Sequence, residues 1–164
     1  METEWQTPPD LFAILDKLAG GFKVDAAATE LNHLCPNWYG PGSPMNEDAL
    51  DVPVWETPAF CNPPYGRGIG EWLVKMKEQA EYGNAVIALL PAKTETVWWC
   101  DGVVPHADIL FLRGRVPFLL PGREKKSQPN HGSAIVSFED TSTGKTWWWD
   151  WKRAIEIAKQ TNNL

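Results

Sequence analysis

The spacing of apolar residues near the start of the chain predicts a helix. The apolar positions within residues 11–18 recur at helical intervals and form one face. Thr7, Pro8 and Asp10 are residue types typical of a helix start, with Thr7 as the N-cap and Asp10 closing a capping box. Gly20-Gly21 then ends the periodic stretch, so we expect the helix to stop there.

Short apolar runs bounded by turn residues predict a set of strands along the rest of the chain. We expect strands at 22–25, 57–61, 85–90, 107–112 and 133–138. Helical patterns fall between and after them, at 69–83, 94–100 and 151–159. Residues 33–58 are rich in Pro, Gly, Asn and Asp, which predicts mostly loop with at most one short strand. The alternation indicates a single α/β domain over 1–164, with a mostly parallel sheet covered by helices.

Composition is typical of a folded soluble protein. The 164 residues are 43% hydrophobic and 22% charged, and no apolar run approaches the roughly 20 residues that span a bilayer. The first residues resemble no secretory signal, so we expect a cytoplasmic protein. Cys35, Cys61 and Cys100 lack the spacing of a zinc site or a disulfide framework, so we expect no metal.

The charge of the chain gives two opposite indications about a nucleic-acid partner. The net charge of −6 is unfavourable for gripping DNA phosphates. Five basic residues nevertheless fall within fourteen positions, which leaves room for one local basic face: Arg113, Arg115, Arg123, Lys125 and Lys126. A solvated loop without a partner explains the same cluster. The ten tryptophans do not decide whether nucleic acid is a partner either, because aromatic rings pack in protein cores as well as stacking on bases.

Asn62-Pro63-Pro64-Tyr65 is the segment that carries chemistry. An amino group on an aromatic ring is a poor nucleophile until hydrogen-bond acceptors draw on its hydrogens. The Asn62 side-chain oxygen and the Pro63 carbonyl are two such acceptors, and the prolines restrict how the carbonyls point. Tyr65 offers a ring for a base that has left the duplex stack. These residues are the predicted catalytic set.

The position of this segment distinguishes it from the common turn that Asn-Pro-Pro forms in other proteins. It follows a predicted strand and precedes a predicted helix. An earlier predicted strand ends at Asp25, beside the small residues 26–28. Because α/β sheets bind ligands beyond the carboxyl ends of their strands, we expect both segments at one site.

In its motifs and their order the chain resembles the phage-type DNA N-6-adenine methyltransferases, also called Dam. The resemblance rests on Trp5-Gln6-Thr7-Pro8-Pro9, Asp25-Ala26-Ala27-Ala28, Asn62-Pro63-Pro64-Tyr65-Gly66-Arg67, Leu89-Leu90-Pro91-Ala92-Lys93-Thr94, Arg113-Gly114-Arg115-Val116-Pro117-Phe118 and Gly132-Ser133-Ala134. It implies a Rossmann-like, S-adenosylmethionine-dependent methyltransferase domain that methylates adenine N6 in DNA after base flipping. DNA is then the partner and S-adenosylmethionine the cofactor.

The resemblance also implies roles for individual residues. The implied cofactor-binding residues are Trp5, Thr7, Pro8, Asp25, Ala26, Asp48 and Ala49. The DNA-binding residues that we expect are Arg67, Arg115, Arg123, Lys125 and Lys126, with His131 near the bases or on the surface. The chain departs from larger adenine methyltransferases in lacking their glycine-rich F-x-G-x-G motif. It also has no recognisable target-recognition domain, which leaves loop 121–132 to read sequence.

Two other functions are compatible with the same residues. Asn-Pro-Pro-Tyr also occurs in enzymes that methylate a protein glutamine amide, a reaction that needs the same acceptors. A non-catalytic nucleic-acid or partner-binding relative would keep the fold without the activity. The sequence predicts neither the recognition site nor the oligomeric state.

Overall fold

The structure of the protein is a computed structural model that describes residues 4–121 and 123–164, and the side chains of residues 123–126 lie outside that description. The helices are α1 (Pro9–Ala19), α2 (Ile69–Glu81), α3 (Val97–Gly102) and α4 (Trp151–Gln160), with a 3₁₀ turn, η1, at Ala49–Asp51. The strands are β1 (Val24–Asp25), β2 (Ala59–Cys61), β3 (Val86–Pro91), β4 (Asp108–Leu112), β5 (Phe118–Leu120), β6 (Arg123–Ser127), β7 (Ser133–Phe138) and β8 (Thr146–Trp149).

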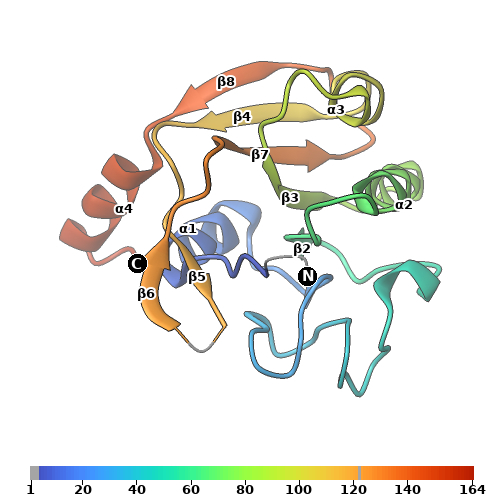
Figure 1. Cartoon of the computed structure of the whole chain (residues 1–164), viewed down its shortest axis with the longest axis horizontal. Helices are drawn as coiled ribbons and strands as arrows, with labels where there is room; N and C mark the ends of the chain where they lie inside the picture. The colour runs from blue at the N-terminus through green and yellow to red at the C-terminus, as the bar shows by residue number, and fades with distance from the viewer. Residues whose placement is uncertain (1–3, 122) are drawn as a thin grey trace.

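The main sheet of the described chain has six strands in the order β1-β2-β3-β7-β4-β8 (Figure 1). Neighbours pair in parallel at β1–β2, β2–β3 and β4–β8, whereas β7 runs antiparallel to both β3 and β4. All strands of this sheet except β7 therefore share one direction. This confirms the predicted α/β fold with a mostly parallel sheet, consistent with a Rossmann-like methyltransferase.

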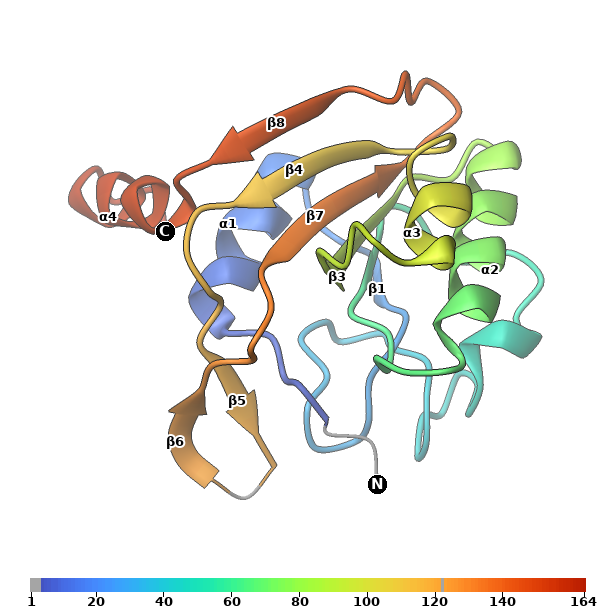
Figure 2. The same cartoon turned by 45° about the horizontal axis from the view of Figure 1, so that its top comes forward.

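Helices cover both faces of the sheet. Leu11 of α1 and Ile155 of α4 belong to one buried apolar cluster, and Leu73 of α2 and Trp99 of α3 belong to another. Figure 2 shows α2 and α3 side by side, away from α1 and α4. The alternating side chains of β2 separate the two clusters, because Phe60 enters the first and Ala59 and Cys61 enter the second. None of the described helices has the length and apolarity that crossing a membrane requires.

The start of α1 differs from the prediction. Pro8 is the N-cap residue and Pro9 begins the helix, so Thr7 lies outside it and makes no cap. Thr7 is instead buried, 5% exposed, with its hydroxyl directed to another part of the chain. The end is as predicted: Gly20 adopts φ 79°, a left-handed conformation that glycine enters without strain, and stops the helix.

Strands occur in one region predicted as loop and in another for which no element was predicted. Segment 121–132 includes β6, which forms an antiparallel hairpin with β5, and Thr146–Trp149 pairs with β4 as the edge strand β8. The residues of β6 are polar throughout, and β8 consists of one threonine followed by three tryptophans, so neither shows the alternation of a half-buried strand. Conversely, residues 33–58 hold η1 and a single bridge between Trp38 and Asp25 rather than a strand.

Candidate active site

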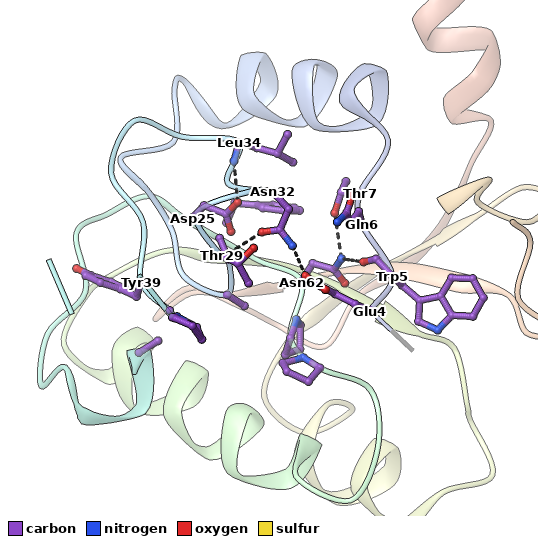
Figure 3. Close-up of a pocket in the computed structure, with 18 of the residues that line it drawn as sticks. Glu4, Trp5, Gln6, Thr7, Asp25, Thr29, Asn32, Leu34, Tyr39 and Asn62 are labelled. Atoms are coloured by element: carbon purple, nitrogen blue, oxygen red, sulfur yellow. Dashed lines mark hydrogen bonds between the residues drawn. The ribbon is translucent and has the colours of Figure 1, made fainter. Parts of the chain in front are cut away.

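A cavity of about 410 Å³ opens beyond the carboxyl ends of β1 and β2 (Figure 3). The strands are in register so that Asp25, at the end of β1, pairs with Phe60, two residues before Asn62. The cavity wall thereby brings together most of the predicted catalytic and cofactor-binding residues: Trp5, Thr7, Asp25, Asp48, Ala49, Asn62, Pro63, Pro64 and Tyr65. Strand ends are where α/β proteins bind ligands, so this is the candidate active site.

Two predicted cofactor-binding residues do not line the cavity. Pro8 caps α1, and Ala26 is fully buried in the apolar cluster with α2 and α3. The other wall residues were not predicted as site residues. Phe60 and Trp72 lie in a predicted strand and a predicted helix, and Gln6, Ala27 and Ala28 lie within quoted motifs, but no pattern marked any of them as facing a ligand. The rest come from segments without periodicity, where the Gly40-Pro41 turn was the one local signal: Glu4, Thr29, Asn32, Leu34, Tyr39, Gly40, Pro41 and Glu47.

Asn62 is held by the N-terminal segment of the chain. Its side-chain Nδ2 donates to the Trp5 carbonyl at 2.6 Å and to the Thr7 hydroxyl at 3.1 Å. Its Oδ1 is buried and has no hydrogen-bond partner within the described part of the chain. A buried acceptor without a partner is costly, so Asn62 is poised to accept a hydrogen bond from a ligand.

Asp25 presents a second unsatisfied oxygen to the cavity. Its Oδ2 accepts from the Leu34 N–H at 3.0 Å, whereas Oδ1 is buried and has no hydrogen-bond partner among the described residues. The residue as a whole is 3% exposed. Burial is the largest influence on it and raises its pKa from 3.8 to about 6, against smaller lowering effects of backbone hydrogen bonds and His33. With a pKa of about 6 the carboxyl is mainly ionised at neutral pH, and no Lys or Arg among the described wall residues faces it.

The charged residues in the described cavity wall are all acidic: Glu4, Asp25, Glu47 and Asp48. No described Lys, Arg or His lines it. Asp48 also caps η1, because its Oδ1 accepts from the Leu50 N–H at 2.9 Å. Such a wall attracts a cation and repels a phosphate group. The described residues contain no cluster of His, Cys, Asp and Glu that could hold a metal ion.

Tyr65 is fixed at the edge of the cavity beside the β5–β6 hairpin. Its hydroxyl donates to the Leu89 carbonyl at 3.1 Å, and burial raises the pKa of the phenol well above its ordinary value, which keeps it protonated. The ring meets Phe118 and His131 edge-to-face, with centroids 6.3 and 6.0 Å apart. His131, predicted either near the bases or on the surface, thus lies against Tyr65 of the predicted catalytic segment.

Gly40 gives a stability prediction for the cavity wall. It has φ 140°, and a Cβ added there would lie 1.8 Å from the Ala28 carbonyl oxygen. Gly40→Ala should therefore lower the free energy of unfolding by at least about 2 kcal/mol, through both strain and the clash. Urea unfolding measures the change, with Gly70→Ala as the control, since a Cβ there meets nothing within 4 Å. Equal stability of the two variants would contradict the close approach of the backbone at Gly40 to that at Ala28.

Two of the predicted DNA-binding residues, Arg67 and Arg115, lie outside the cavity. Arg67 borders a separate surface depression along α2, and Arg115 is exposed between β4 and β5. The other three, Arg123, Lys125 and Lys126, lie in β6. Only the backbone of these residues is described, so their side chains are not placed. Their strand forms one side of a hairpin whose other strand, β5, contains Phe118, which contacts Tyr65.

Comparison with known proteins yields a family and one curated relative. A family model described as DNA N-6-adenine-methyltransferase (Dam) matches residues 1–158. The DNA N-6-adenine-methyltransferase of Escherichia phage T1 is 28% identical over 123 residues, which cover 73% of this chain and 49% of that protein. The chain thus aligns with about half the length of the relative. No solved structure matches.

Proposed function

The chain belongs to the DNA N-6-adenine-methyltransferase (Dam) family, and we propose that it transfers a methyl group from S-adenosylmethionine to the N6 amino group of adenine in DNA. The observation that carries this proposal is the Asn62 side chain, whose buried oxygen faces no partner in a cavity lined by the Asn-Pro-Pro-Tyr segment. The relative from phage T1 bears the same activity in its name.

The residues of the cavity fit S-adenosylmethionine. Its sulfonium and ammonium groups are cationic, and all charged residues of the described wall are acids. The unpartnered Asp25 oxygen is an acceptor for an ammonium or hydroxyl group, and Glu47 and Asp48 add negative potential. A volume of about 410 Å³ is in the range of small-molecule sites. When bound, the cofactor supplies a methyl carbon that is already strongly electrophilic.

Catalysis by this chain is then a matter of alignment and hydrogen bonding. The Asn62 oxygen and the Pro63 carbonyl accept hydrogen bonds from the adenine amino group, which frees its lone pair for attack. Pro64 keeps Pro63 extended, so its carbonyl direction is preset. A neutral amide suffices, because the amino group needs an acceptor while it reacts and can lose its proton to water afterwards.

Tyr65 is the residue we assign to the flipped base. Its hydroxyl bond to Leu89 and its edge contacts with Phe118 and His131 hold the ring in one place. A base stacked on such a ring gains about 1 to 3 kcal/mol, which offsets part of the cost of leaving the duplex. The aromatic cluster lies at the base of the β5–β6 hairpin, so we assign DNA contact to that hairpin and to Arg115 and Arg67.

The direct test is to incubate the pure protein with labelled S-adenosylmethionine and mixed-sequence duplex DNA, and to map modified bases at single-base resolution. We expect N6-methyladenine in a defined sequence context. A parallel reaction with glutamine-containing proteins should stay unlabelled. Label in protein and none in DNA would overturn the proposal, as would tight cofactor binding with no product on any DNA.

The basic strand β6 gives a prediction about DNA affinity. Changing Arg123, Lys125 and Lys126 together to alanine should weaken DNA binding and flatten its salt dependence, by about one unit of slope for each phosphate that is no longer neutralised. Fluorescence anisotropy at several salt concentrations measures both. The matched control changes three lysines on the helices, Lys17 of α1, Lys77 of α2 and Lys159 of α4, which removes the same charge outside β6. Equal slopes for the two triple variants would exclude β6 from the interface.

A further inference from the structure

We infer that the N-terminal segment Glu4–Thr7 orients the catalytic amide, with Thr7 as a positioning residue that acts on adenine through Asn62. The inference rests on the proposed function and adds to it a role for residues that lie 55 and 57 positions from Asn62 in the chain. Thr7 then has two roles, because it lines the cavity and also orients the Asn62 amide.

The hydrogen bonds determine which way the Asn62 amide faces. The Trp5 carbonyl can only accept, so the atom 2.6 Å from it must be the amide nitrogen. The Thr7 hydroxyl accepts from the same nitrogen at 3.1 Å. Two acceptors thus match the two N–H bonds of the amide. Because the amide is planar, its oxygen is turned away from the segment, and that oxygen is the buried atom without a partner.

The segment that provides these acceptors is itself anchored on both sides of the cavity. Glu4 accepts from the side-chain amide of Asn32, in the loop after β1 (Figure 3). Gln6 exchanges two backbone hydrogen bonds with Leu119 of β5, at 2.9 and 3.0 Å. The Trp5 ring packs on Phe118 with centroids 5.6 Å apart. These contacts make residues 4–7 a fixed support.

The contacts from residues 4–7 keep the Asn62 amide in the orientation that the reaction needs. The terminal torsion of an asparagine side chain has a broad energy profile, so a free amide samples both orientations of its nitrogen and oxygen. An amide turned the wrong way would present N–H groups to the N–H groups of adenine. Holding the nitrogen with Trp5 and Thr7 excludes that orientation before substrate arrives, and preorganised acceptors of this kind act without reorganisation during the reaction.

The test replaces the Thr7 hydroxyl while keeping its shape. Thr7→Val should lower kcat about 10-fold and leave the KM for DNA within about twofold, since it removes one of two groups that orient the amide. Thr7→Ser restores the hydroxyl and should recover kcat to within about threefold of the wild type. A Thr7→Val variant with wild-type kcat would overturn the inference, as would equal losses in the Val and Ser variants.

Two further measurements separate orientation from packing. If Thr7 acts only through Asn62, adding Thr7→Val to Asn62→Ala should cause no further loss of kcat, whereas an additive loss would contradict the inference. The side-chain amide protons of Asn62, followed by NMR, should exchange at least about 10-fold faster in Thr7→Val. Should Thr7→Val fail to fold, Thr7→Ala enters the same comparisons.

The exchange measurement needs no turnover, so the two proposals fail separately. Unprotected Asn62 amide protons in the wild-type protein would overturn the positioning role even if DNA is methylated. Protected protons in a wild-type protein that methylates no DNA would overturn the proposed function and leave the orientation of the amide supported.

Discussion

Replacing Asn62 by alanine is expected to lower the turnover number at least about 100-fold while cofactor affinity stays nearly unchanged. The substitution removes a preorganised hydrogen-bond acceptor at the point where positive charge develops on the amino nitrogen. In other enzymes, deleting one preorganised hydrogen-bonding group lowers turnover by about 100- to 1,000-fold. Cofactor affinity should persist because Asp25 and the other acids of the cavity remain. Single-turnover kinetics on duplex DNA measure the first quantity and calorimetry the second.

The control for this variant is Asn163→Ala, which removes an exposed asparagine near the C-terminus and should behave as the wild type. Nearly full activity of Asn62→Ala would refute the mechanism. A loss of cofactor affinity as large as the loss of turnover would instead assign Asn62 to binding rather than to catalysis.

Asp25→Asn is expected to change stability and affinity in opposite directions. The pKa of Asp25 is raised from 3.8 to about 6 by burial, so the folded protein binds a proton that the unfolded chain has lost between these pH values. Stability of the ligand-free protein therefore falls as pH rises from about 4 to about 6, and the penalty is complete above that range. An asparagine avoids the charge penalty and keeps an oxygen for the Leu34 N–H, whereas its buried amide nitrogen offsets part of this gain, so at pH 7 the free energy of unfolding should rise by at most about 2 kcal/mol.

The same variant should bind S-adenosylmethionine at least about 10-fold more weakly, because the cavity loses its most buried negative charge. In the wild-type protein, affinity should fall as pH drops below about 6, where Asp25 becomes protonated. Calorimetry across pH 5–8 and urea unfolding at pH 7 measure the two effects. Asp140→Asn, at an exposed acid, is the control and should change neither. Unchanged affinity in Asp25→Asn would remove this residue from the site.

The conflict between stability and function at Asp25 has a parallel at Asn62. Each residue buries an oxygen without a partner, and the folded protein tolerates this cost only because other bonds hold the group in place: the Leu34 N–H for Asp25, and Trp5 with Thr7 for Asn62. Both oxygens belong to the wall of one cavity. Such local violations of polar satisfaction are expected at functional sites.

Sequence patterns determined the elements whose signals are local. The spacing of apolar residues predicted α1, α2 and α4, because an amphipathic helix buries one face of its own sequence. Continuous apolar runs predicted β3, β4 and β7 for a similar reason. The strand–Asn-Pro-Pro-Tyr–helix order was equally visible, and so was the placement of Asp25 at a strand end. These features depend on neighbours a few residues apart.

Only the tertiary structure decided how distant segments complete the cavity. Thr7 has the local pattern of a helix cap, but its hydroxyl bonds to Asn62, a contact between residues 55 positions apart that no local period encodes. The same holds for the β5–β6 hairpin and for the acidic residues of the loop after Gly40. Their positions depend on pairing and packing with residues elsewhere in the chain. A polar side chain takes whichever hydrogen-bond partner the fold brings within reach, and that choice exists only once the chain has folded.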